Sequence, residues 1–213
     1  MSEPEERTNE PEKRMTFPNP LLVVVSGPSG VGKSTVVSEL ARRRPQVVPI
    51  VTATTRERRE GEIDGVHYHF LSKEAFRELM ERDGLLEHAN NHGYRYGTPV
   101  DQVRGILAAG RDAILTISPR GARNVRRLVP DALLIFVMPP SMEDLAQRLR
   151  GRGSESEESI ERRRQDAERW MAEADDYDHI VVNETGHLED AADKIWAIIQ
   201  AEARRDSPRR PRV

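Results

Sequence analysis

GPSGVGKS, residues 27–34, fits the pattern G-x-x-x-x-G-K-[ST] at every fixed position. The stretch comes directly after the β-branched run Leu21–Val25, and apolar residues at helical spacing follow it. This context predicts a strand, a glycine-rich turn and a helix, and the backbone N–H groups of such a turn bind phosphate at the helix N-terminus. We therefore expect a nucleotide phosphate site made of Gly27, Pro28, Ser29, Gly30, Val31, Gly32, Lys33, Ser34 and Thr35.

Two side chains of this loop have distinct expected roles. A lysine at this place in the pattern reaches the β- and γ-phosphates, so we expect Lys33 to stabilise the charge of the transferred group. The hydroxyl of Ser34 is the expected protein ligand of Mg²⁺. GTPases, ATPases and kinases share this loop, so it does not decide the reaction by itself.

Apolar runs alternate with helical patterns along the rest of the chain. A strand-like run precedes a helix-like segment three more times. The strand-like run Ala113–Ile117 precedes Ala122–Leu128, Ala132–Val137 precedes Met142–Leu149, and His179–Val182 precedes Leu188–Ile199. This alternation indicates a parallel β-sheet covered by helices on both faces. We predict an α/β chain with the P-loop NTPase fold.

Changes in texture divide the chain into expected parts. A polar interval rich in Arg, Glu, His, Tyr and Gly predicts an inserted small mixed α/β nucleotide-binding subdomain at residues 52–98, and a charged interval predicts a mobile helical lid at about 148–166. The core is then residues 20–51 and 99–202 of a domain spanning 20–202. We expect disordered tails at 1–19, rich in Glu and Pro, and at 203–213, rich in Arg.

The composition of the 213 residues limits the possible functions. The formal net charge of −3 gives no general reason to expect nucleic acid as a partner. Cysteine is absent, so a metal would be bound through oxygen. The opening residues are too polar for a signal peptide, and no apolar run approaches the roughly 18 residues of a membrane span. We expect a cytoplasmic protein without a membrane partner.

The segment Thr52–Phe70, with Leu86–Ala89 and Tyr94–Thr98 after it, resembles guanylate kinase. Similar stretches continue through Met138–Ser141 and Arg148–Gly153, so the resemblance extends from about residue 21 to about residue 199. It implies ATP-dependent phosphorylation of GMP, and of dGMP, to the diphosphate by direct in-line transfer, in purine nucleotide metabolism. It also implies Mg²⁺ as cofactor and a monomer or homodimer.

The resemblance assigns the acceptor site residue by residue. Arg56, Arg59, Tyr68 and Tyr96 match the positions that hold the GMP phosphate, and two arginine forks with two tyrosine hydroxyls suit a dianion. Glu87 matches the residue that reads guanine, whose N1–H and exocyclic amino group a single carboxylate can accept. The hydroxyl positions that serve the purine O6 match Thr52 and Thr98, and Ser118 stands where the family has an Asp that helps to read guanine.

The lid and the ATP base are assigned in the same way. Arg148, Arg152 and Arg163 match the lid arginines that close over ATP, and with Lys33 they are the expected catalytic residues. Asn183 matches the position that contacts the adenine of ATP. A salt-bridged surface helix is the alternative interpretation of these arginines.

The sequence departs from the family pattern at one informative place. The Asp-x-Asp pair that normally follows the third strand is replaced by Thr116 and Ser118. Two smaller departures are His88, where the family usually has Trp, and Trp170, where the family often has Glu. Lost carboxylates weaken contacts with guanine donors or metal-bound water. A related P-loop kinase with a different nucleotide or a sugar phosphate as acceptor is therefore an alternative. A scaffold domain without catalysis and a GTP-dependent switch are less favoured, because the loop is intact and Asn-Lys-x-Asp is absent.

Overall fold

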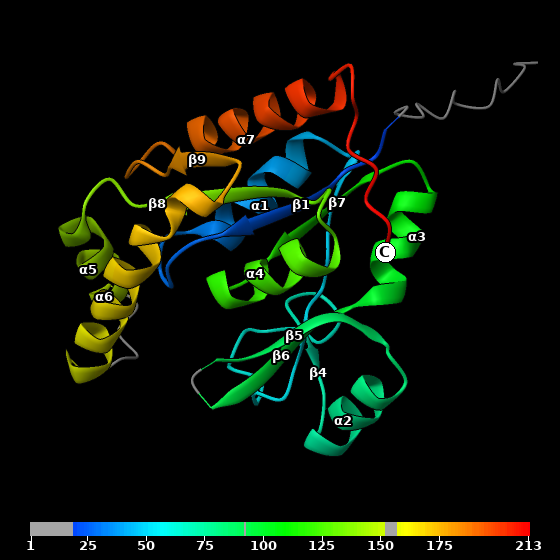
Figure 1. The fold of residues 1–213 in the computed structure, drawn as a ribbon. Helices are drawn as coiled ribbons and strands as arrows, with labels where there is room; N and C mark the ends of the chain where they lie inside the picture. Colours follow the sequence, from blue (N-terminus) through cyan, green and yellow to red (C-terminus); the bar gives the residue numbers. More distant parts are fainter. Residues whose placement is uncertain (1–18, 92, 152–156) are drawn as a thin grey trace, which may run out of the picture.

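The computed structural model describes residues 19–91, 93–151 and 157–213. Its larger sheet is parallel and has the strand order β2-β7-β1-β8-β9 (Figure 1). The strands are β1 (Leu22–Ser26), β2 (Val47–Pro49), β7 (Asp112–Thr116), β8 (Leu133–Met138) and β9 (His179–Val182). The predicted parallel sheet is confirmed, with β2 as an additional short edge strand.

Helices cover both faces of this sheet because β1 is apolar on both. Val23 and Val25 pack into one buried cluster, with α1 (Lys33–Arg43) and α7 (Leu188–Ala203). Leu22 and Val24 pack into a second cluster, with α3 (Val100–Ala108) and α4 (Pro119–Leu128). Alternate residues of a strand face opposite sides, so a continuous apolar run is required here. The predicted α/β fold class is confirmed.

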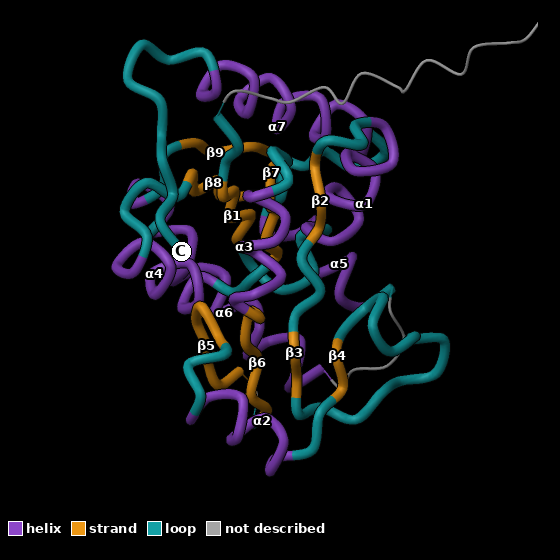
Figure 2. Tube along the Cα trace, turned by 90° about the vertical axis from the view of Figure 1, so that its right-hand side faces the viewer, coloured by secondary structure: helices purple, strands orange, loops and turns teal. Residues whose placement is uncertain are grey.

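A second, smaller sheet lies below the first in Figure 2 and has the strand order β4-β3-β6-β5. Its strands are β3 (Ala53–Thr54), β4 (His69–Phe70), β5 (Leu85–Asn91) and β6 (Tyr94–Pro99). The helix α2 (Lys73–Glu81) covers one face, since a Cβ on Gly97 would lie 3.1 Å from the ring of Phe76. Tyr96 and Thr98 flank Gly97 on β6, so they point to the opposite face.

Two further helices, α5 (Met142–Arg150) and α6 (Glu157–Ala172), lie together beside the larger sheet (Figure 1). A short 3₁₀ turn, η1 (Ala174–Asp176), connects α6 to β9. Leu145, Leu149 and Ile160 anchor this pair in the cluster beneath α1. No helix within the described ranges combines the length and apolarity that crossing a bilayer requires.

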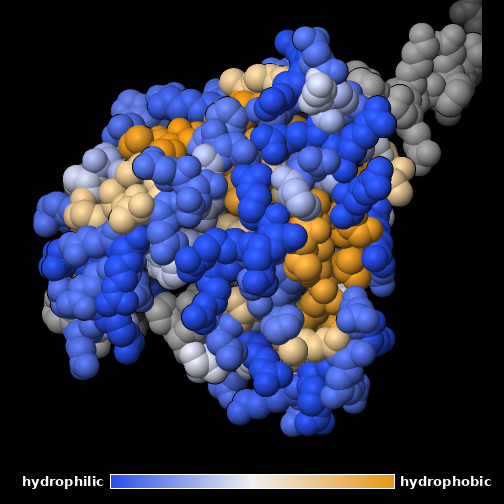
Figure 3. Space-filling view, in the orientation of Figure 1, coloured by the Kyte–Doolittle hydropathy of each residue, from blue (hydrophilic) through white to orange (hydrophobic). Residues whose placement is uncertain are grey.

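The carboxyl-terminal segment differs from the predicted solvated tail. After α7 the chain returns across the molecule to α3 (Figure 1), and Arg209 forms ion pairs with Glu202 and Asp178. Val213 packs on the cluster beside α3, where Figure 3 shows apolar side chains reaching an otherwise mainly hydrophilic surface. Long-range ion pairs of this kind leave no local sequence signal. The predicted amino-terminal tail lies outside the described residues, apart from residue 19.

Candidate functional site

The predicted nucleotide residues follow the carboxyl ends of the parallel strands. The glycine-rich loop follows β1, and Asn183 follows β9. Thr116 is the last residue of β7, and Ser118 is the N-cap of α4. In the larger sheet β1 lies between β7 and β8, so the chain adds strands first on one side of β1 and then on the other. Ligands of open α/β sheets bind at such a switch point.

The glycines of the loop permit a close approach that other residues would block. Gly27 has φ 142°, and a Cβ there would lie 2.2 Å from the carbonyl oxygen of Val137. The Lys33 ammonium donates to the carbonyl oxygens of Gly27 and Pro28, each over 2.8 Å. Ser34 is exposed in the first turn of α1, so its hydroxyl is accessible where the helix dipole favours an anion.

The helices α5 and α6, which include most of the described part of the predicted lid, contact this loop through arginines. Arg163 on α6 donates to the hydroxyl of Ser29 over 2.5 Å. Arg148 on α5 donates to the carbonyl oxygens of Val31, over 3.2 Å, and of Asn183, over 2.8 Å. Arg152 lies outside the described residues. The two described lid arginines are therefore brought to the phosphate loop.

The side chain of Asn183 also faces the phosphate loop. Asn183 is 7% exposed, and its Nδ2 donates to the carbonyl oxygen of Val31 over 2.8 Å. A Cβ at position 32 would lie 2.6 Å from this nitrogen, so Gly32 is required for the fit. An adjacent hollow of about 530 Å³ is lined by Pro140, Asp144, Glu184, Thr185, His187 and Asp190.

Three of the four predicted acceptor-phosphate residues, Arg56, Tyr68 and Tyr96, lie close together. The guanidinium of Arg56 lies 5.4 Å from the ring centre of Tyr68, whose ring is 6.0 Å from that of Tyr96. Glu62 accepts a hydrogen bond from Arg56 over 2.6 Å, and this contact raises the pKa of Arg56 and lowers that of Glu62. Burial raises the pKa of the Tyr68 hydroxyl. The sequence interpretation missed Glu62, which orients the arginine and neutralises it.

Glu87 and Thr98, which were predicted separately to contact the purine, form a hydrogen-bonded pair. Glu87 is 4% exposed on β5, and its Oε1 accepts a hydrogen bond from the Thr98 hydroxyl over 2.9 Å. Burial raises the pKa of this carboxyl to about 7, against the lowering effect of the Thr98 hydrogen bond. Thr98 and Tyr96 are two apart on one strand, so both predicted groups lie on the face of the small sheet opposite α2.

Ser118 has a structural role that the sequence interpretation did not assign. It is the N-cap of α4, and its hydroxyl oxygen accepts from the backbone N–H of Gly121 over 3.3 Å. A Cβ on Gly121 would lie 3.0 Å from Oε2 of Glu87, so the start of α4 packs directly against the predicted base reader. The signal was available, since Ser118 followed by Pro119 is typical of a helix N-terminus.

The remaining predicted residues are more dispersed. Thr52 is buried just before β3, and Arg59 is exposed in the loop after it. His88 is exposed on β5, and its carbonyl accepts from Asn124 of α4. The ring of Trp170 on α6 lies 5.3 Å from the guanidinium of Arg123 on α4. Trp170 therefore links α6 to α4, the helix that packs against Glu87.

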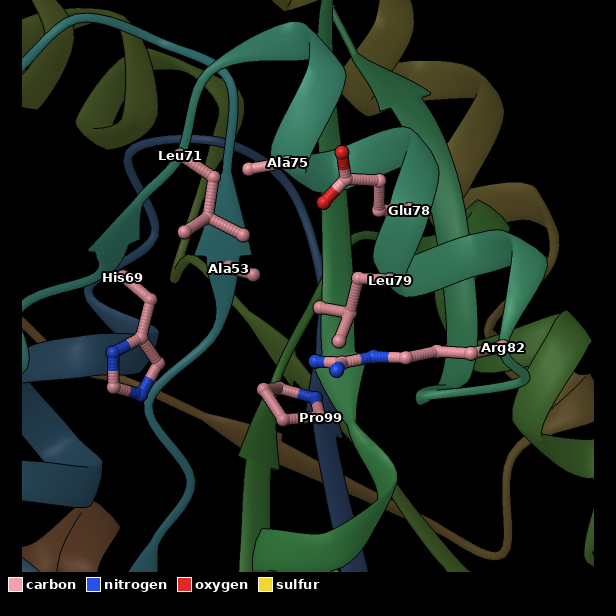
Figure 4. Close-up of a pocket in the computed structure, with 8 residues that line it drawn as sticks. All are labelled: Ala53, His69, Leu71, Ala75, Glu78, Leu79, Arg82 and Pro99. Carbon is pink, nitrogen blue, oxygen red and sulfur yellow. The ribbon is translucent and has the colours of Figure 1, made fainter.

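A separate cavity of about 330 Å³ lies on the α2 face of the small sheet (Figure 4). Apolar side chains form much of its lining, with Glu78, Arg82 and His69 at its edge (Figure 4). The complete lining is Ala53, His69, Leu71, Ala75, Glu78, Leu79, Arg82 and Pro99. None of the predicted site residues belongs to it.

Three comparisons with known proteins give the same family. The family model described as guanylate kinase matches residues 19–202. A guanylate kinase of Desulfitobacterium hafniense is 48% identical over 85% of this chain and 90% of its own length, and one of Thermobifida fusca is 49% identical over 84% and 91%. The crystal structure of guanylate kinase from Anaplasma phagocytophilum superposes with a TM-score of 0.72 at 30% identity, covering 88% of each chain.

Proposed function

This chain belongs to the guanylate kinase family and catalyses ATP-dependent phosphorylation of GMP, and we propose that the residues gathered at the two sheets carry out that transfer. GMP binds on the face of the small sheet opposite α2. The GMP phosphate contacts Arg56, Arg59, Tyr68 and Tyr96, and the guanine contacts Glu87, Thr98, Thr52 and Ser118. The triphosphate of ATP lies along residues 27–35.

The transfer needs no covalent enzyme intermediate. An oxygen of the GMP phosphate attacks the γ-phosphorus of ATP while the bond to the β-phosphate oxygen breaks, which gives GDP and ADP. Lys33, Arg148, Arg152 and Arg163 neutralise the charge that spreads over the transferred group. Positioning of the two phosphates and exclusion of water supply the remainder of the rate enhancement.

The donor set at the loop fits a magnesium ion carried by ATP. Mg²⁺ prefers oxygen ligands and keeps several waters, so one protein hydroxyl beside substrate phosphates suits it. The described residues hold no group of three or more His, Cys, Asp or Glu side chains placed for a metal. Ser34 is the proposed protein ligand, and a Mg²⁺ ion held there would neutralise negative charge on the phosphates of ATP.

The buried pair of Glu87 and Thr98 is the observation that carries the choice of acceptor. A carboxylate accepts from N1–H and the exocyclic amino group of guanine, whereas adenine presents an unprotonated N1 there. ADP release with Mg·ATP against GMP, dGMP, AMP, IMP, CMP and UMP tests the assignment. We expect rapid turnover of GMP and dGMP, weaker turnover of IMP, which lacks the amino group, and little with the others.

A different preferred acceptor in that panel would contradict the assignment. The relatives described above are guanylate kinases, so the alternative nucleotide or sugar-phosphate acceptor has no support from them. Residues 52–98 are the proposed GMP-binding subdomain, and residues about 148–166 are the proposed lid. We further propose that the protein acts in the cytoplasm as a monomer or homodimer, which sedimentation with and without nucleotides would distinguish.

A further inference from the structure

One carbonyl of the phosphate loop is held from outside the loop by two side chains. The oxygen of Val31 accepts from Nδ2 of Asn183, over 2.8 Å, and from Nη1 of Arg148, over 3.2 Å. Arg148 also donates to the carbonyl oxygen of Asn183 and to the hydroxyl of Thr185. The end of α5 and the segment after β9 therefore clamp the same peptide group.

Holding this oxygen fixes the direction of the next N–H group. A trans peptide is planar, and its C=O and N–H point in opposite directions. The described backbone has no cis peptide, so the N–H of Gly32 points in the direction opposite to the Val31 oxygen that Asn183 and Arg148 hold. Gly32 itself has φ 96°, and glycine is permissive enough that backbone preference alone does not fix this plane.

We propose that Asn183 is a positioning residue that locks the Val31–Gly32 peptide plane, so that the N–H of Gly32 faces the phosphates of ATP. The inference rests on the proposed assignment of residues 27–34 as the phosphate site. A reversed plane would present the Val31 oxygen to the phosphates and replace attraction by repulsion. This role is distinct from the adenine contact that the family resemblance implies for Asn183.

Asn183→Asp is the most direct test, because it keeps the size of the side chain and replaces the donating NH₂ by an oxygen that repels the Val31 carbonyl. Turnover is measured with ATP and with inosine triphosphate, which has an oxygen in place of the 6-amino group of adenine. We expect kcat to fall about tenfold with both donors, as for one lost hydrogen bond in the transition state. The KM for GMP should stay unchanged. Asn183→Ala should cost no more than Asn183→Asp, since alanine removes the donor without adding repulsion.

Controls separate this role from loss of folding and from failure of the site itself. Thermal melts establish that the variants are folded, and Asn90→Asp, at an exposed position of β5, should keep the wild-type kcat. Unchanged kcat in Asn183→Asp, or a loss with ATP that inosine triphosphate does not share, would overturn the inference. Full activity of Lys33→Ala would instead overturn the assignment of the loop, so the two failures are distinguishable.

Discussion

The proposed guanine-binding role of Glu87 predicts that GMP binding depends on pH. Burial raises the pKa of the Glu87 carboxyl to about 7, and the two donors of guanine favour the ionised form. We therefore expect the KM for GMP to fall as pH rises from about 6 to about 8, because the carboxylate forms over that interval. The measurement is steady-state kinetics at saturating ATP, with Glu87→Gln as the variant whose profile keeps only the titration of the GMP phosphate.

The same shift predicts a stability effect of opposite sign. The stabilising contribution of protonated Glu87 is complete below its ordinary pKa of 4.5 and is lost as pH rises through about 7. Without nucleotide, Glu87→Gln should thus be more stable than the wild type at pH 8 and similar to it at pH 4, by denaturant unfolding. A variant less stable at pH 8 would show that the carboxylate is already compensated by partners other than Thr98.

Gly121 sets the space available to Glu87. A Cβ there would lie 3.0 Å from Oε2 of Glu87 and 3.3 Å from Cδ1 of Ile117. We expect Gly121→Ala to displace the carboxylate and lower kcat/KM for GMP about tenfold, the equivalent of one weakened hydrogen bond, with the KM for ATP unchanged.

Gly105→Ala is the matched control for this substitution. A Cβ on Gly105 of α3 would meet nothing within 4 Å, so alanine should stabilise the protein by about 0.5–1 kcal/mol and leave GMP kinetics alone. An equal loss of GMP turnover in both variants would show that helix flexibility, not the position of Glu87, is responsible.

At the scale of elements, α4 depends on its cap. Ser118 accepts from the N–H of Gly121, so Ser118→Ala should lower the free energy of unfolding by about 1 kcal/mol. Ser118→Asp restores the carboxylate usual in the family and keeps an equally good N-cap, so stability should be retained. Urea unfolding of the two variants checks the expectation; equal destabilisation by Asp and Ala would mean that the hydroxyl has a partner other than the helix.

The elements themselves were largely predictable, and the reason differs from one to the next. β1, β7 and β8 are the three inner strands of the larger sheet, so their apolar runs are continuous and their assignments are confirmed. β9 is an edge strand, and its apolar run His179–Val182 was still sufficient to predict it. β2 escaped prediction because a three-residue edge strand ending in Pro49 carries little pattern. The helix α7 was recognisable because its apolar residues recur at helical spacing over 16 residues.

Over the whole molecule, sequence reasoning named candidate site residues but not the contacts between them. The pairing of Glu87 with Thr98 follows from register across β5 and β6, which no local pattern specifies. The contacts of Arg148 with Val31 join residues 117 positions apart. Contacts of this kind depend on the order of the strands in the sheet. A sequence motif can therefore indicate a candidate site residue without indicating which residue it contacts.

The carboxyl-terminal segment is expected to stabilise the whole fold rather than the reaction. Arg209 is 14% exposed and donates to Glu202 over 2.7 Å and to the carbonyl of Ala132 over 3.1 Å. Although burial alone would raise the pKa of Glu202, hydrogen bonds from Arg209 and His179 leave it lowered. Removing Arg209 takes away the most buried partner of Glu202 and leaves it Arg205 and His179, whose side chains are 53% and 36% exposed. Arg209→Ala should therefore lower the free energy of unfolding at pH 7 by about 1–2 kcal/mol.

The pH dependence of that loss gives the sharper test. A lowered carboxyl pKa contributes stability above the ordinary value of 4.5 that disappears as pH falls through the folded value. The difference between wild type and Arg209→Ala should therefore shrink in acid while kcat at pH 7 stays the same. Arg212→Ala, at an exposed arginine of the same segment, is the control and should change little. Of these two arginines, Arg209 is the one that pairs with Glu202. An equal loss of stability in both variants would therefore show that the overall positive charge of the segment is the cause.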